Sequence, residues 1–185
     1  EGYLDVIMLH QVGFENVVAT CGTALTNEHI PLIKKSNSKI ILAFDGDNAG
    51  ILAAFKASNL LIQHQLDSKV VIFEDGIDPA DMVKTGQIDD IKNLFVNAKP
   101  SIKFCLNTII KKYDINTPED KQKAYKEAND FLLTLTDFLQ NEYKPYLSSI
   151  LNIDEKVIKT KMQIKANPQI INNNYKIENK REDFS

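Results

Sequence analysis

The chain has 185 residues, of which 43% are hydrophobic and 25% charged, and its formal net charge is −3. This length is enough for one good domain, alone or with a small second one, and the composition is that of a globular protein rather than a fibrous or loop-rich chain. The weakly negative sum does not by itself indicate a nucleic-acid binder, although a whole-chain sum can hide a local basic face.

The two cysteines, Cys21 and Cys105, lie far apart and outside any CxxC spacing. This excludes a disulfide framework and predicts no zinc within this chain. The sequence shows no apolar run near the roughly 18 residues of a membrane span and no signal peptide. We therefore predict a cytoplasmic protein that does not use a membrane.

The first elements of the chain alternate between helical and extended patterns. Apolar residues at helical spacing predict a helix over residues 3–10, with Gly13 as its stop. Val17–Thr20 is a short β-branched run of the kind found in strands. The next helix is predicted over Thr26–Lys35, with Thr26 as its N-cap.

Two buried strands flank a long helix in the next segment. Lys39–Phe44 and Lys69–Phe73 are nearly unbroken apolar runs, which is the pattern of strands covered on both faces. Ala49–Gln65 reads as the helix between them. Strands that alternate with helices predict an α/β fold with a mostly parallel sheet, whose functional site lies at the carboxyl ends of the strands.

After about residue 97 the pattern becomes entirely helical. Thr117 followed by Pro118 and two acids is a good helix start. The predicted helices cover residues 100–113, 117–140, 142–151 and 154–164. We predict an α/β domain over 1–97, an all-α helical subdomain over 98–165, and a polar linker or disordered tail over 166–185.

Asp45 and Asp47 stand in the segment FDGDNAG, where the first buried strand should end. Gly46 relieves crowding between them, and Gly50 permits close approach by neighbouring backbone. Paired carboxylates at such a position suit Mg²⁺ or Mn²⁺, which keep several waters and need few protein ligands. A turn with helix-capping aspartates explains the same residues, and short motifs have many false positives.

Further acids follow other strand-like segments. Asp78 and Asp81 come after the second buried strand, where they also fit the N-cap and third position of a helix that starts with Pro79. Glu1 opens the chain beside Gly2 and could reach the same end of the sheet as Asp45. Concentrated negative charge is costly unless cations bind, so together these acids favour a divalent-metal site for phosphate chemistry, with one or two metals.

Four segments in this order, EGYLD, VVATCGTALT, FDGDNAG and DGIDPADMV, resemble the Toprim fold. They are most similar to the second half of the catalytic core of bacterial DnaG-type replicative primases. The resemblance covers residues 1–97 by motif and extends with weaker motifs to about residue 165. It also implies that this chain is a fragment, with the first Toprim strand truncated and the basic N-terminal half of the core missing, and that the fragment is nearly inactive alone.

The resemblance implies a role for each matching residue. Glu1, Asp45 and Asp47 match the catalytic acids and metal ligands, and Asp78 matches an acid at the rim of the site. Asp81 is a less secure match because this chain has DPAD where primases have DPD. The matching structural glycines are Gly2, Gly46 and Gly50.

The implied activity is RNA primer synthesis on single-stranded DNA from ribonucleoside triphosphates, with Mg²⁺ or Mn²⁺ as cofactor. In the primosome, the replicative helicase would bind a domain C-terminal to this chain. Many primases have arginine after the AG of the central motif, whereas this chain has Ile51, so the resemblance implies no phosphate contact from this position. Lys56 is a weak candidate for a nucleic-acid or nucleotide contact, as are Lys34 and Lys35, which equally fit a solvated helix end.

Two other classes of function fit the same motifs. A Toprim nuclease or topoisomerase-type domain would use the same acids to cut DNA. A non-enzymatic Toprim-like scaffold would instead bind a replication protein through its helices. Metal binding separates the two enzymes from the scaffold, and the product separates primer synthesis from strand cleavage.

Overall fold

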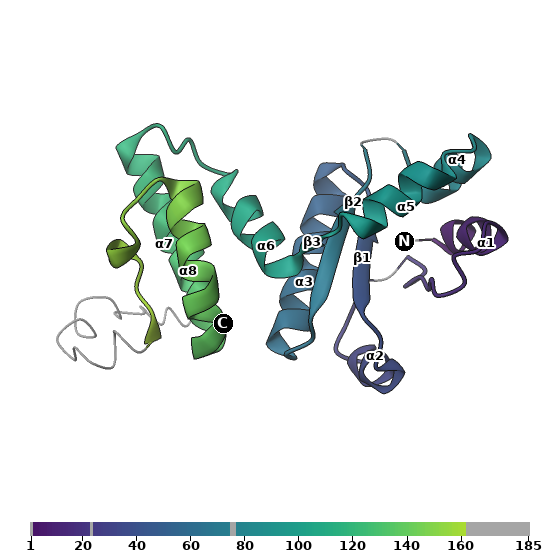
Figure 1. The fold of residues 1–185 in the computed structure, drawn as a ribbon, viewed down its shortest axis with the longest axis horizontal. Coiled ribbons are helices and arrows are strands. Elements are labelled where there is room, and N and C mark those ends of the chain that lie inside the picture. The colour runs from purple at the N-terminus through teal and green to yellow at the C-terminus, as the bar shows by residue number, and fades with distance from the viewer. Residues whose placement is uncertain (1, 23, 75–76, 162–185) are drawn as a thin grey trace, which may run out of the picture. The chain divides into compact units, whose positions relative to one another are not determined.

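The computed structural model describes residues 2–22, 24–74 and 77–161 (Figure 1). The packing divides the chain into two compact units, Glu1–Lys112 and Tyr113–Ser185. The first, unit 1, is the α/β part, and the second, unit 2, is helical in the part that the structure describes. The predicted tail over 166–185 lies outside the described residues.

Unit 1 is built on a small mixed sheet of strands β1 (Ile40–Phe44), β2 (Ser68–Ile72) and β3 (Lys99–Pro100), in the order β1-β2-β3. β1 and β2 are parallel, with Phe44 opposite Ile72, which confirms the predicted β-α-β arrangement. β3 runs antiparallel to β2 and pairs with Lys69 and Val70. The prediction of no strand after residue 97 was therefore wrong, and Val17–Thr20 is not a strand.

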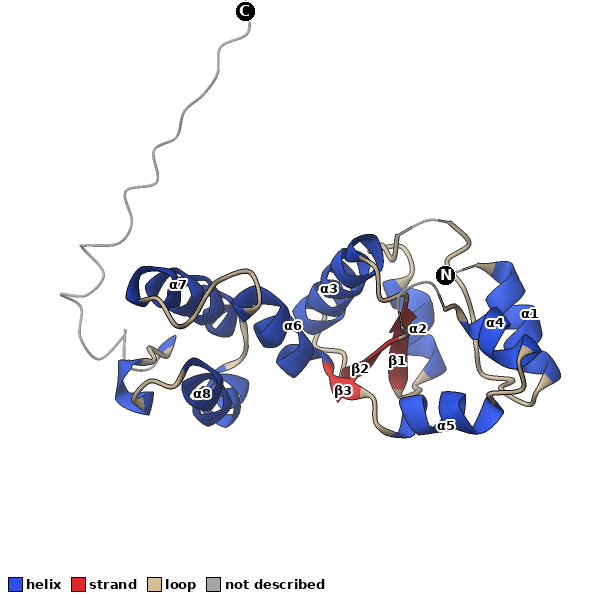
Figure 2. Cartoon of the chain, turned by 90° about the horizontal axis from the view of Figure 1, so that it is seen from above, coloured by secondary structure: helices blue, strands red, loops and turns tan. Residues whose placement is uncertain are grey.

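In the described part of unit 1, six helices lie around this sheet (Figures 1 and 2). They are α1 (Tyr3–Gln11), α2 (Ile30–Ser36), α3 (Asn48–Gln63), α4 (Pro79–Lys84), α5 (Ile88–Val96) and α6 (Ser101–Ile110). One core cluster joins Val71 and Phe73 to Leu9, Met82 and Ile91 from α1, α4 and α5. On the other face, α3 packs on β1 and β2 and also on α6. β2 is thus covered on both faces, as its apolar sequence predicts.

Helix α2 begins four residues later than its sequence predicts. The segment before it forms a turn in which the Thr26 backbone N–H donates to His29 Nδ1 at 3.0 Å. The helix starts at Ile30 with Pro31 in its first turn. Because the Thr26 side chain also contacts His29, it does not cap the helix. The predicted N-cap role of Thr26 was wrong.

Unit 2 contains α7 (Pro118–Thr134), α8 (Asp137–Leu151) and a 3₁₀ turn at Glu155–Val157. The predicted single helix over 117–140 is interrupted at Leu135, which is extended. Thr136 then caps α8 through its hydroxyl, which accepts from Leu139 N–H at 3.4 Å. A local side-chain cap therefore ends one helix and starts another inside a continuous helical pattern. In the described part of the helix predicted over 154–164, the structure has this short turn, and α-helix is assigned only at Lys161.

Helix α6 belongs to unit 1, because it packs on α3, β2 and β3. The predicted division at residue 97 had placed this segment in the helical subdomain. Its inner face buries Ile102, Cys105, Leu106 and Ile109. Among the described residues, no helix is both long and apolar enough to cross a membrane.

The two thiols differ in environment, which gives a test of the packing between α3 and α6. Cys21 is exposed, whereas Cys105 is buried and burial raises the pKa of its thiol from 9.0 to about 12. We expect a disulfide reagent to modify Cys21 in the folded protein and Cys105 only on unfolding. Because the raised pKa belongs to the folded state, its contribution to stability is complete below pH 9.0 and falls as the pH rises towards about 12.

Thiol titration of the Cys21→Ser variant, in native buffer and then in denaturant, checks this expectation. Rapid reaction of Cys105 in native buffer would contradict the packing of α6 on α3.

Candidate metal centre at the carboxyl end of the sheet

The carboxyl ends of β1 and β2 are level with each other. The Phe73 backbone N–H donates to the Phe44 carbonyl at 2.9 Å, which continues the parallel ladder one step beyond the strands. Asp45 follows β1 directly, and Glu74 follows Phe73 on the neighbouring strand. Two acids therefore leave adjacent strands at the edge where parallel sheets place their sites.

Asp47 caps the N-terminus of α3. Its Oδ1 accepts a hydrogen bond from the Gly50 backbone N–H at 2.6 Å, with Asp47 itself extended at ψ 170°. The cap uses one carboxylate oxygen, and the side chain remains exposed. Capping fixes the carboxylate without consuming its second oxygen, so the capping and metal-ligand interpretations of Asp47 are compatible.

Gly50 holds Asp45 and Asp47 in one arrangement. Its backbone N–H anchors Asp47, and its α-carbon lies against the backbone of Asp45. A Cβ built on Gly50 would overlap the Asp45 carbonyl oxygen and come within 3.0 Å of its carbonyl carbon. The predicted close approach at Gly50 is thus present, and the approaching backbone is that of the first aspartate.

Asp78 and Asp81 lie at the start of α4. Asp78 Oδ1 accepts from the Asp81 N–H at 2.6 Å, as predicted for an N-cap, and Asp81 pairs with Lys84 at 2.9 Å. The pKa of Lys84 is raised, first by the hydrogen bond and charge of Asp81 and then by the charges of Asp78 and Asp5. Asp78 and Asp81 therefore favour the charged form of Lys84, a lysine of their own helix. Asp5 of α1 has the same effect on Lys84, and its carboxylate also accepts a hydrogen bond from the Gly2 N–H.

The residues present suit a metal that needs few protein ligands. Glu1 lies outside the described residues, and the described part of the chain contains no group of three or more acids, histidines or cysteines poised to hold an ion. Asp45 and Asp47 supply two carboxylates on a fixed backbone. Mg²⁺ is commonly bound through one or two carboxylates with the remaining positions taken by water and substrate phosphate.

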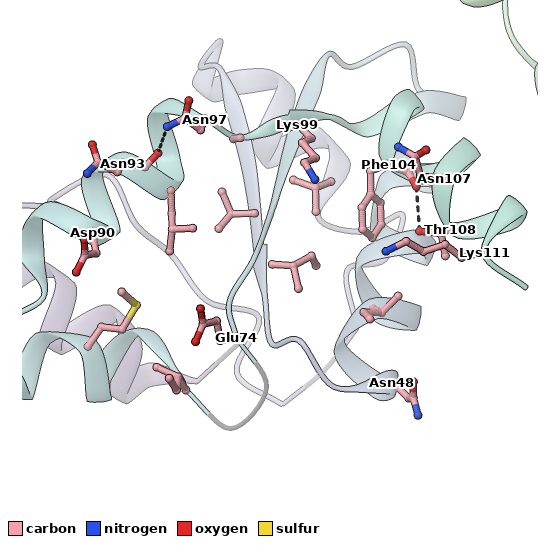
Figure 3. Close-up of a pocket in the computed structure, with 18 of the residues that line it drawn as sticks. Asn48, Glu74, Asp90, Asn93, Asn97, Lys99, Phe104, Asn107, Thr108 and Lys111 are labelled. Carbon is pink, nitrogen blue, oxygen red and sulfur yellow. Dashed lines mark hydrogen bonds between the residues drawn. The ribbon is translucent and has the colours of Figure 1, made fainter. Parts of the chain in front are cut away.

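Next to these acids, a pocket of about 1200 Å³ extends along the outer edge of β2 (Figure 3). Asn48 and Glu74 line its end beside the aspartates, and Lys99, Asn107 and Lys111 line the β3–α6 side. Sequence reasoning singled out none of these residues. Phe104, Thr108 and Lys111 do share one helical face, but the sequence does not reveal that this face borders an open pocket.

Lys56 lies on a different face of α3. It borders a smaller depression with Thr26, Asn27, Asn59 and Gln63. It follows Asp47 by nine positions, which is about 13 Å along a helix. A contact between Lys56 and nucleic acid would therefore be made away from the aspartates, and it stays a prediction.

Comparison with known proteins identifies what this chain is similar to. Residues 1–83 match a Toprim-like family. The chain is 44% identical over 168 residues to the DNA primase of Helicobacter pylori strain 26695, which covers 91% of this chain and 30% of that protein. It is 38% identical over 158 residues to the DNA primase of Campylobacter jejuni, which covers 85% of this chain and 26% of that protein.

Solved structures agree with these relatives. A DnaG catalytic core has a TM-score of 0.72 at 26% identity, covering 86% of this chain and 53% of that one. A DnaG primase catalytic domain bound to single-stranded DNA has a TM-score of 0.74 at 27% identity, covering 84% and 51%. The chain thus spans between a quarter and a third of these curated relatives and about half of the solved chains.

The close approach of Gly50 to Asp45 predicts that a Gly→Ala substitution at this helical position destabilises the protein. Gly→Ala inside a helix ordinarily stabilises by about 1 kcal/mol. Gly50→Ala should instead lower the free energy of unfolding by about 1–3 kcal/mol, because the new methyl overlaps the Asp45 backbone. Urea unfolding followed by circular dichroism measures the change.

The matched control is Ala49→Gly in the same helical turn, where the side chain is exposed. It should lose about 1 kcal/mol, the ordinary cost of glycine in a helix. A Gly50→Ala variant more stable than the unmodified chain would show that the close approach is absent.

Proposed function

Because this chain has the Toprim fold and is similar over most of its length to bacterial DNA primases, we propose that it is the metal-binding part of a primase catalytic core. The proposed reaction is the synthesis of RNA primers from ribonucleoside triphosphates on a single-stranded DNA template. The observation that carries the proposal is the geometry at Gly50, which fixes Asp45 and Asp47 together at the carboxyl end of β1. This geometry is found in a chain 44% identical to a DNA primase.

In this proposal Glu1, Asp45 and Asp47 are the catalytic acids and metal ligands, with Asp78 at the rim and Asp81 a weaker candidate. Bound Mg²⁺ or Mn²⁺ would lower the pKa of a coordinated hydroxyl and neutralise phosphate charge, in a site for one or two ions. The task of the aspartates is to present carboxylate oxygens at a fixed position. The cap from Asp47 to Gly50 N–H and the buried glycine contact supply that preorganisation.

Other parts of the activity would come from outside the described residues. The DnaG structure bound to single-stranded DNA supports a DNA template as the partner of this chain. Contacts to the triphosphates and to a replicative helicase, through a domain that follows this chain, are also part of the proposal. Low activity of this chain alone is a further part of the proposal; the chain covers 30% of the Helicobacter pylori primase.

The test replaces the matching segment of the Helicobacter pylori primase with this chain and assays RNA synthesis on single-stranded DNA with Mg²⁺. We expect primers from the chimera, and a loss of more than about 100-fold in the Asp45→Asn/Asp47→Asn variant, since even partners of metal ligands contribute 10–100-fold. Asparagine is also a good N-cap, so the variant should keep its fold.

The matched control, Asp67→Asn/Asp89→Asn, removes two exposed acids elsewhere in unit 1 and should leave primer synthesis unchanged. Absence of RNA from the unmutated chimera, or shortened DNA in its place, would contradict primer synthesis and favour a Toprim nuclease. Full activity of the Asp45→Asn/Asp47→Asn variant would remove the two aspartates from the mechanism.

A further inference from the structure

The pocket beside the candidate metal centre is open because the sheet ends there. β3 pairs with β2 only at Lys69 and Val70, while β2 continues to Ile72. Helix α5 packs with the core on one face of β2, and α6 packs on the other. The edge of β2 therefore forms the floor of a groove of about 1200 Å³ between two helical walls (Figure 3).

The wall of this groove formed by β3 and α6 is basic. Lys99, Lys111 and Lys112 line it, and all three side chains are exposed. Lys112 Nζ lies 5.8 Å from the centre of the Phe55 ring. Within the described part of the chain, Lys99 and Lys111 make no ion pair, so their charges are available to a ligand.

Neutral polar groups extend this wall towards the metal centre. Asn107 and Thr108 stand between Phe104 and Lys111 on α6, and Asn48 is the residue directly after Asp47. Figure 3 shows Asn107, Thr108 and Lys111 together on one side of the pocket, with Asp90 and Asn93 of α5 on the opposite side. Asp90 therefore lies opposite the basic wall, whereas Glu74 follows β2 at the end of the groove beside the aspartates.

We propose that this basic wall binds the phosphate backbone of a single-stranded nucleic acid and leads the strand to or from Asp45 and Asp47. The inference rests on the proposed function, because it assigns a strand path to the same site. Lysines bind phosphates as point charges, and amide side chains commonly bond to phosphates and bases. A positively charged groove that follows the phosphate backbone is one of the features that proteins use to bind single strands.

The experiment measures binding of fluorescent 20-mers of deoxythymidylate and of uridylate to the 185-residue chain by anisotropy, across a salt series without nucleotides. The test variant is Lys99→Gln/Lys111→Gln/Lys112→Gln. Loss of three phosphate contacts should weaken binding by about tenfold or more and reduce the slope of log K against log salt by about 2. The corresponding triple Arg variant keeps the charges and should retain binding.

The matched control, Lys39→Gln/Lys69→Gln/Lys92→Gln, removes the same charge from exposed lysines of unit 1 outside the groove. It should keep at least half of the affinity. Equal losses in the two Gln triples would show a general effect of charge and overturn the proposal, as would unchanged binding in the groove variant. Failure of the unmodified chain to bind either oligomer at low salt would overturn it as well.

Comparison of the two oligomers distinguishes a DNA template from an RNA product as the occupant. The metal centre has a separate readout, because Asp45→Asn/Asp47→Asn should leave oligomer binding intact while it abolishes primer synthesis in the chimera. The groove variant, Lys99→Gln/Lys111→Gln/Lys112→Gln, can also be assayed for primer synthesis in the chimera. If it loses oligomer binding but still makes primers at the normal rate, this strand path is contradicted and the proposed function still stands.

Discussion

The approach of Gly50 to the backbone of Asp45 is the constraint on which the candidate centre depends. An α-helix separated from a buried strand by only three residues must pass close to the end of that strand. Here the contact is so close that no side chain fits. The same glycine donates its N–H to Asp47. One residue without a side chain therefore sets the position of both carboxylates, and β1 and α3 hold it in place through the core of unit 1.

The short third strand is the second constraint. A longer β3 would pair along β2 and close the groove, whereas pairing at Lys69 and Val70 alone leaves the upper edge of β2 beside Glu74 open. Because α6 follows β3 directly and packs on the sheet, Lys111 and Lys112, which come after its last turn, line this groove. A candidate metal centre and a basic wall thus come from the same small sheet, which places negative ligands and positive contacts next to each other.

Periodicity and motif spacing in the sequence predict the parallel pair β1 and β2, the helix between them and the helix cap at Asp78, because these features depend on neighbours along the chain. The acids of FDGDNAG are likewise a local signal. Features set by distant residues are not predictable in this way. The break at Leu135, the two-residue β3, the turn that delays α2 to Ile30 and the packing of α6 on α3 all depend on tertiary contacts. The basic wall was missed because Lys99, Lys111 and Lys112 become a surface only once β3 and α6 are placed.

The most direct test of the central claim is the position of the metal. Crystals of the chain grown with MnCl₂ would give an anomalous difference map at the manganese absorption edge. The account predicts a peak at about 2.1–2.3 Å from carboxylate oxygens of Asp45 and Asp47, a hard-ion distance. A well-ordered site with no peak there, or a peak bound only by Asp78 and Asp81, would contradict the account.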